Sequence, residues 1–275
     1  MAIDYEVEYD NRSRVPEHPG IVARWLEASA RVRATGPCDL DLSYGKADRH
    51  RYDLFHPTDE APDAPVVVYI HGGYWQRGDR KDYSFIAEEL VNRGAIVAVP
   101  SYTLCPEATV AEIINEMRAF LVALWSRTQR RAVVVGHSAG GHLAAAMLAT
   151  DWPSLRDVPA DLVRAAYSIS GVFELEPLIP TSLNVALRLS SGTARKASPL
   201  LWPSPRPGSS FVAAVGGAES SEFLRQSLDI ARAWYAAGVN AERVVVPDAN
   251  HFTIVDEIAR PGSPMVERIL KLALA

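Results

Sequence analysis

The sequence predicts an α/β fold: a mostly parallel eight-stranded sheet with helices on both faces and a small cap. Two observations lead to this prediction. Short β-rich runs alternate with helical patterns along the chain, an order that produces a parallel sheet covered on both faces. The 275 residues are 48% hydrophobic, which is enough apolar surface for one large core. Because no internal repeat or low-complexity tract divides the chain, we expect a single domain over residues 1–275.

Eight short runs rich in apolar and β-branched residues are the predicted strands. They cover residues 39–44, 51–56, 66–70, 95–99, 132–135, 165–169, 211–215 and 242–246. No helical pattern separates the first two runs. We therefore expect these two to form an antiparallel hairpin at one edge of the sheet.

Helical periodicity fills most of the intervals between these strands. The predicted helices cover residues 21–33, 83–92, 110–125, 142–148, 222–237 and 265–274. Thr109 and Glu112 form a capping box at the start of the third helix. The first helix precedes the sheet, so we expect it to pack over a sheet edge or near the functional site.

One connection is unusually long. Between Ile169 and Phe211 the chain is rich in Pro and Ser, with only a weak helical patch at residues 183–189. Long loops inside compact domains are commonly lids or binding loops. We expect a cap-like insertion at about residues 172–208, packed over the active site.

A nucleophile motif follows the fifth predicted strand. The strand 132–135 leads directly into Gly136-His137-Ser138-Ala139-Gly140, and a helix-forming run comes next. G-x-S-x-G between a strand and a helix is typical of the α/β-hydrolase fold, where a tight turn exposes the serine. Because that turn is crowded, the residues two before and two after the serine must be small. The motif predicts Ser138 as the nucleophile.

The third predicted strand ends in a second glycine motif, His71-Gly72-Gly73. An acyl-transfer enzyme needs N–H donors directed at the oxyanion of its transition state, and glycines let the backbone approach closely. We expect the oxyanion hole to consist of the N–H of Ala139 and those of Gly72 or Gly73. The alternative is a simple Gly-Gly turn after a strand.

The base must be a histidine late in the chain, because the order in this fold is serine, acid, histidine. Of the seven histidines, His137 and His142 lie too close to Ser138 in sequence to fold back onto it. His251 lies just past the last predicted strand. It is therefore the predicted base.

The acid should follow the penultimate strand, 211–215. Glu219 is the first carboxylate past that strand and is the predicted acid. Two alternatives remain open. Glu222 suits the start of the next helix, and Asp248 lies on the loop that carries His251 itself.

Three motifs together resemble the serine-dependent kynurenine formamidases (arylformamidases), relatives of the hormone-sensitive lipase group. They are HGGYW at 71–75, GHSAGGH at 136–142 and SGVFELEP at 170–177, and the similarity extends over most of the chain from about Asp53 onward. The resemblance implies a catalytic triad of Ser138, Glu219 and His251, although the family usually has Asp where Glu219 stands. It also implies hydrolysis of N-formylkynurenine to kynurenine and formate.

Four aromatic residues are candidates for the substrate pocket. Tyr74 and Trp75, next to the oxyanion motif, could shape a tight site for a formyl group, or they could pack in the core. Phe173 and Trp202, at the two ends of the cap, could stack on an aromatic leaving group or pack under the cap. Two other functions stay open: a carboxylesterase for small acyl esters, and a non-catalytic binding protein with a hydrolase fold.

Composition excludes several other classes. A formal net charge of −5 argues against nucleic acid as a partner. Cys38 and Cys105 are too few for a disulfide framework, and no metal-ligand spacing occurs, so we expect neither a metal nor a cofactor. No apolar run is long enough to span a membrane, and residues 1–10 lack a signal pattern. We expect a cytoplasmic enzyme for a small-molecule substrate; a homodimer is compatible with the sequence.

Overall fold

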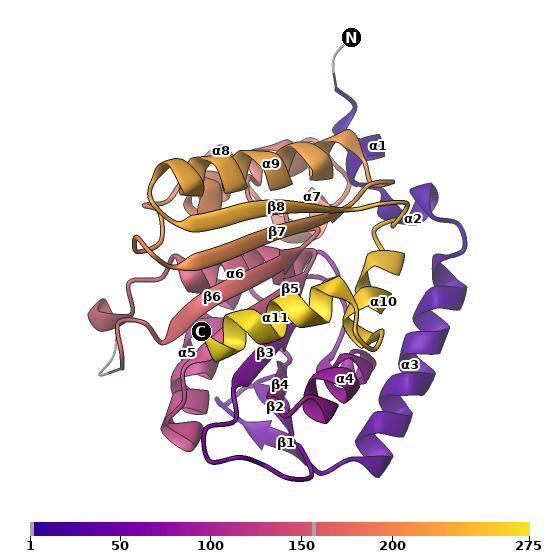
Figure 1. Ribbon diagram of the computed structural model, residues 1–275. Helices are drawn as coiled ribbons and strands as arrows, with labels where there is room; N and C mark the ends of the chain where they lie inside the picture. Colours follow the sequence, from indigo (N-terminus) through magenta and orange to yellow (C-terminus); the bar gives the residue numbers. More distant parts are fainter. Residues whose placement is uncertain (1–2, 156–157) are drawn as a thin grey trace.

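The computed structural model describes residues 3–155 and 158–275 and is built on one eight-stranded sheet (Figure 1). The strand order is β1-β2-β4-β3-β5-β6-β7-β8. The strands are β1 (Cys38–Ser43), β2 (Arg51–Phe55), β3 (Val66–Ile70), β4 (Ile96–Pro100), β5 (Ala132–His137), β6 (Val163–Ile169), β7 (Ser210–Gly216) and β8 (Asn240–Val246). The predicted eight-stranded α/β fold is confirmed.

The sheet is antiparallel only at one edge. β1 pairs antiparallel with β2, as the missing helix between these two strands predicted, and β2 also pairs antiparallel with β4. All other pairs are parallel, with β5 between β3 and β6. Because the carboxyl ends of parallel strands lie at the same edge, the loops after β3, β5, β7 and β8 meet there. This edge is where the predicted site residues lie.

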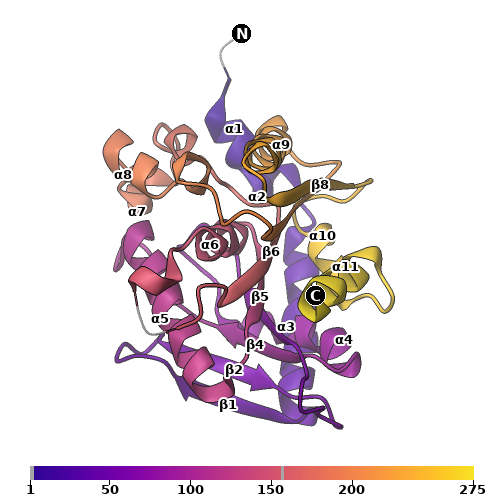
Figure 2. The ribbon, with the colours of Figure 1, turned by 60° about the vertical axis from the view of Figure 1, so that its left-hand side comes forward.

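The central strands are buried on both faces, which explains their continuous apolar sequence. Along β3, Val66, Val68 and Ile70 belong to one hydrophobic core, whereas Val67 and Tyr69 belong to the other. The first core packs under α5 (Val110–Thr128), α6 (Ala139–Leu148) and α9 (Ser221–Ala236); the second packs under α3 (His18–Thr35), α4 (Ala87–Asn92), α10 (Thr253–Ala259) and α11 (Pro264–Leu274). Figure 2 shows these two helical layers on opposite sides of the sheet.

The helices differ from the prediction mainly where they are short. The predicted helix at 83–92 is a 3₁₀ turn (Ser84–Ile86) followed by the shorter α4. Four helices had no clear periodicity in the sequence, because helices of one or two turns depend on tertiary packing. They are α1 (Tyr5–Tyr9), α2 (Asn11–Arg14), α8 (Ser191–Lys196) and α10.

The long connection between β6 and β7 contains only short helical segments. These are the 3₁₀ turns Glu176–Leu178 and Pro199–Leu201, α7 (Asn184–Leu187) and α8. α7 ends at Arg188, which adopts a left-handed conformation (φ 51°). Among the described residues, no helix is both long and apolar enough to cross a membrane.

Candidate active site

Ser138 occupies a strained turn between β5 and α6. Its φ of 56° and ψ of −118° are unusual for a residue with a side chain. The turn is possible because its neighbours are glycines: a Cβ on Gly136 would overlap the carbonyl of Gly140, and a Cβ on Gly140 would overlap the carbonyl of Ile70. The Ser138 N–H donates to the carbonyl of Ile169, 2.8 Å away, which ties the turn to β6.

The loop after β3 packs directly against this turn. A Cβ on Gly72 would lie 3.0 Å from the Cβ of Ser138 and 2.9 Å from the carbonyl oxygen of His137. Gly73 has a φ of 108°, a conformation that favours glycine. In the described part of the chain, the N–H groups of Gly72, Gly73 and Ala139 donate no hydrogen bond. These three donors are therefore free to bind a developing negative charge.

Glu219 is the carboxylate that contacts the predicted base. Its Oε2 lies 2.7 Å from Nδ1 of His251, and both side chains are buried. Its Oε1 accepts hydrogen bonds from the N–H of Gly216 at 2.7 Å and from the hydroxyl of Ser170 at 2.5 Å. Glu219 Oε2 accepts from His251, so the proton of the imidazole lies on Nδ1 and Nε2 is left as the acceptor.

The two alternative acids lie elsewhere. Asp248 is exposed and adopts a left-handed conformation (φ 58°) in the turn before His251. Glu222 accepts a hydrogen bond from the hydroxyl of Tyr9 at 2.9 Å and pairs with Arg225 at 2.8 Å. Neither of these carboxylates contacts His251.

Ser138 and His251 both line one cavity of about 590 Å³. No direct hydrogen bond joins these two residues, both of which the structure describes. A catalytic hydrogen bond is often long in a ligand-free enzyme and shortens when the substrate binds. A substrate bound in this cavity would therefore contact both Ser138 and His251.

Two other histidines support the site. His137 Nε2 lies 2.8 Å from the carbonyl of His251; since a carbonyl only accepts, this nitrogen carries the proton. Burial, together with the neighbouring charge of His251, lowers the pKa of His137 well below its usual range. His71 is buried against Tyr102, with ring centroids 4.4 Å apart, and burial lowers its pKa to about 4. Both rings therefore act as neutral structural groups.

Aromatic side chains form one part of the cavity wall, and most of them were not predicted. Beside the predicted residues Tyr74 and His251, the aromatic lining residues are Tyr9, His18, Trp25, Tyr83, His137 and Phe252. Trp25 comes from α3, and its ring lies 6.3 Å from that of Phe252. The expectation that the first helix packs near the site was the only sequence signal for this wall.

Three predicted pocket residues do not line this cavity among the described residues. Trp75 is fully buried and packs edge-on against His142, with ring centroids 4.9 Å apart. Phe173 is fully buried against Phe211. Trp202 is only partly buried: its Nε1–H donates to the carbonyl of Lys196, and the guanidinium of Arg118 lies 5.9 Å from its ring centroid. Trp75 and Phe173 therefore pack in the core, whereas Trp202 packs against Arg118.

The N-terminal helices α1 and α2 form part of the cavity wall, a contribution that the sequence did not reveal. Tyr74 donates its hydroxyl to the carbonyl of Tyr9 at 2.8 Å and accepts from the amide of Asn11 at 3.2 Å. The hydroxyl of Tyr9 in turn accepts from Gln226 on α9 at 2.7 Å. This network fastens the start of the chain over the site.

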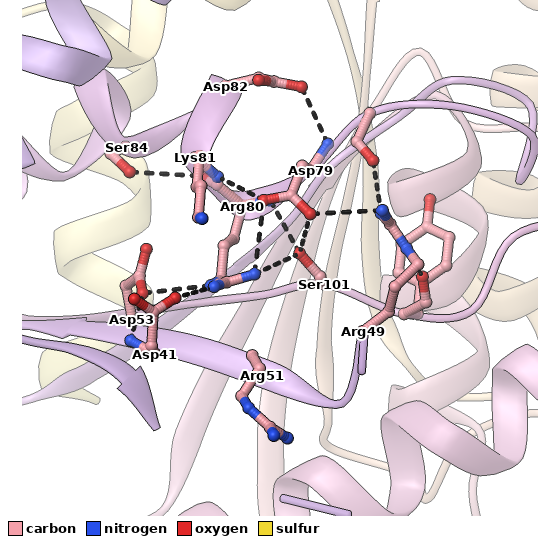
Figure 3. Close-up of polar contacts among 12 residues, drawn as sticks. Asp41, Arg49, Arg51, Asp53, Asp79, Arg80, Lys81, Asp82, Ser84 and Ser101 are labelled. Carbon is pink, nitrogen blue, oxygen red and sulfur yellow. Dashed lines mark hydrogen bonds and ion pairs between the residues drawn. The ribbon is translucent and has the colours of Figure 1, made fainter. Parts of the chain in front are cut away.

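An ion cluster, buried at Asp53 and Arg80, contacts the later part of the loop after β3 (Figure 3). Asp53 on β2 is fully buried and pairs with Arg33 and with Arg80, whose Nε lies 3.2 Å from its Oδ1. Nearby, Arg49 donates to the carbonyl of Gly78 at 2.6 Å and pairs with Asp79 at 3.3 Å. The cluster therefore holds residues 78–80, which lie on the same loop as the oxyanion motif.

Within residues 3–155 and 158–275, no group of three or more His, Cys, Asp or Glu side chains could hold a metal ion. The two cysteines are free thiols. The groups available for chemistry are a hydroxyl, an imidazole paired with a carboxylate, and free backbone donors.

This sheet order, with a serine turn after β5 and an acid–histidine pair after β7 and β8, defines a hydrolase of the α/β-hydrolase class. A kynurenine formamidase from Danio rerio is 30% identical to this chain over 257 residues, which cover 91% of this chain and 87% of the relative. The chain belongs to the kynurenine formamidase family, as its three motifs indicated.

Two solved structures and one family model agree with this class. A candidate thioesterase from Silicibacter sp. TM1040 is 30% identical, with a TM-score of 0.87 over 98% of this chain and 100% of that one. An esterase from the bacterial hormone-sensitive lipase family shares the fold at 20% identity, with a TM-score of 0.67 over 98% of this chain and 100% of that one. The model of a family described as BD-FAE matches residues 52–156.

Proposed function

We propose that this chain hydrolyses N-formylkynurenine, or a closely related N-formyl aryl amine, to the free arylamine and formate. The observation that carries the proposal is the aromatic cavity of about 590 Å³ that contains both Ser138 and the Glu219-bound imidazole of His251. An aromatic wall suits an aryl leaving group. The kynurenine formamidase relatives act on this class of bond by name.

In the proposed first step, Ser138 Oγ attacks the formyl carbon while His251 Nε2 accepts the hydroxyl proton. The carbonyl oxygen becomes an oxyanion bound by the N–H of Ala139 and by those of Gly72 or Gly73. When this intermediate collapses, the C–N bond breaks and His251 returns the proton to the departing nitrogen. The arylamine leaves, and the formyl group remains on Ser138 as an ester.

Water completes the cycle. His251 removes a proton from a water molecule that attacks the formyl ester. The C–O bond to Ser138 then breaks as His251 returns this proton to Ser138 Oγ, and formic acid leaves and ionises to formate. An anilide nitrogen is weakly basic, so it leaves more readily than an alkyl amine once it is protonated. Glu219 holds the imidazole in orientation and stabilises its charged form during both steps.

We further propose that the β6–β7 connection acts as a small cap. Thr181, Ser182 and Leu183 from this connection line the cavity. Ser182 also bonds through its N–H and hydroxyl to the carboxylate of Glu6 on α1, at 2.7 and 2.6 Å. The cap and the N-terminal helices would thus close the same opening from two sides.

A second candidate function is a carboxylesterase, which uses the same groups. The similarity to the candidate thioesterase favours it, because that protein matches this chain at the same identity over nearly its whole length. The purified protein would be assayed on N-formylkynurenine, an N-acetyl anilide and a short aryl ester. A formamidase should give its highest kcat/KM on the first substrate; highest efficiency on the ester, with negligible formamide cleavage, would favour the esterase.

A further inference from the structure

Two arginines line the catalytic cavity without any partner among the described residues. Arg12 lies on α2, and Arg77 lies on the loop that follows the oxyanion motif. Both side chains are exposed, and neither guanidinium forms a hydrogen bond or ion pair within the described chain. A guanidinium carries five N–H donors that strongly prefer a carboxylate or phosphate. The cavity therefore contains two guanidiniums whose N–H groups have no acceptor in the described chain.

Arg77 is anchored at its base beside the reacting centre. A Cβ on Gly73 would lie 2.8 Å from Cγ of Arg77, so the arginine stem packs directly on the oxyanion loop. Partial burial of the Arg77 side chain against the loop and the neighbouring charge of Arg12 lower the pKa of Arg77, so the two cations lie within electrostatic reach of each other. An anion between them would relieve this repulsion.

The carboxylates in the same cavity already have donors. Asp10 accepts from the N–H of Ser13 at 3.1 Å, and Asp82 accepts from the N–H of Asp79 at 3.0 Å. Glu6 accepts from both the N–H and the hydroxyl of Ser182. Asp10 also lies within electrostatic reach of Arg12, but neither guanidinium forms a hydrogen bond or ion pair with a cavity acid. The unused N–H donors of the two arginines therefore suit an anionic ligand.

We propose that Arg12 and Arg77 form a carboxylate-binding subsite that recognises the acidic end of the leaving group. This inference rests on the proposed function and deepens it: the substrate is an N-formyl aryl amine that carries a free carboxylate. The formyl group lies at Ser138, the aryl ring lies along the wall formed by Trp25 and Phe252, and the carboxylate reaches the arginines. The two arginines are specificity-determining residues and take no part in bond cleavage.

The test compares N-formylkynurenine with its α-carboxamide, which has nearly the same shape without the charge. The variants are Arg12→Gln, Arg77→Gln and the double variant. Arg14→Gln is the matched control, because Arg14 lies on the same helix, is exposed and does not line the cavity. Thermal unfolding of each variant establishes that it is folded.

The wild-type enzyme should prefer the carboxylate by about tenfold to a hundredfold in kcat/KM, the usual size for a hydrogen bond to a charged group. That ratio should fall toward one in the double variant, mainly through KM, and should persist in Arg14→Gln. High salt should also reduce it, since both arginines are exposed. A wild-type ratio near one, or a ratio unchanged in the double variant, overturns the subsite and leaves the formamidase function standing.

A separate outcome bears on the proposed function. If neither formyl compound is cleaved while 4-nitrophenyl acetate is, the formamidase function fails. The subsite is then decided by using the two formyl compounds as inhibitors of ester hydrolysis. Inhibition at least about tenfold stronger by the carboxylate, lost in the double variant, supports the subsite. Equal inhibition by both compounds overturns it.

Discussion

The imidazole of His137 lies 2.8 Å from the backbone carbonyl of His251, so the residue beside the nucleophile holds the loop of the base. His137 is buried at the end of β5, and its lowered pKa keeps the ring neutral with the proton on Nε2. The two imidazole rings also pack together, with centroids 4.7 Å apart. This hydrogen bond and the ring contact join the loop of the nucleophile to the loop of the base.

Replacing His137 by Phe should reduce kcat by about tenfold to a hundredfold, because it removes this buried donor and leaves a carbonyl without a partner. His137→Gln keeps an N–H donor and should lose less. Steady-state kinetics on the best substrate, with the fold checked by circular dichroism, measures both. Equal losses in the two variants would show that ring packing matters and the hydrogen bond does not.

Replacing Glu219 by Gln should lower kcat by about a thousandfold or more, since the imidazolium loses its counter-charge and the tautomer is no longer fixed. Asp248→Asn is the comparison, because Asp248 lies on the same loop as His251 but is exposed. It should change kcat by less than about threefold, as expected for a surface position. The reverse ranking, with both proteins folded, would assign the acid to Asp248.

Protein stability should fall as the pH decreases below about 6.5. Burial lowers the pKa of His142 to about 4 in the folded state, whereas an unfolded histidine titrates near 6.5. Between these values the unfolded chain binds the extra proton, so the free energy of unfolding decreases toward low pH. In His142→Gln, the loss between pH 7 and pH 5 should be smaller by about 2 kcal/mol. Urea unfolding at pH 7 and pH 5 measures the free energy of unfolding of both proteins. An identical decrease in the wild type and the variant would contradict the lowered pKa of His142.

The buried carboxylate of Asp53 should be important for folding. Asp53→Asn removes the counter-charge of two arginines and should cost about 3–5 kcal/mol in the free energy of unfolding. The matched comparison is Glu88→Gln, which breaks the exposed pair with Arg31 and should cost far less. Urea unfolding compares the two. A similar small effect from both changes would mean that the cluster in Figure 3 is not required to hold the loop after β3.

The sequence predicted the features that depend on short-range pattern. All eight strands, the edge hairpin and the turn at Ser138 follow from β-rich runs, a missing helix and the need for glycine at 136 and 140. The choice of Glu219 over Asp248 followed from strand order, and the contact between Glu219 and His251 agrees with that choice.

Long-range packing determined what the sequence did not predict. Ser170, which follows β6, bonds to Glu219, which follows β7, and Asn11 bonds to Tyr74, 63 residues further along the chain. Helices as short as α1 and α2 have too little periodicity to be recognised, so their part in the cavity stayed hidden. The sequence left the role of Trp75 open between the substrate pocket and the core, because an aromatic side chain beside a site packs equally well in either. In the structure Trp75 is fully buried.

Hydrolysis of N-formylkynurenine by the wild-type protein and by Ser138→Ala, followed as release of kynurenine and formate, tests whether the formyl group passes through Ser138. The wild type should release equal amounts of the two products. The variant should lose roughly 10⁴-fold or more in kcat, because it retains only binding and the backbone donors. A folded Ser138→Ala protein that retains a substantial fraction of the wild-type rate would show that Ser138 is not the nucleophile.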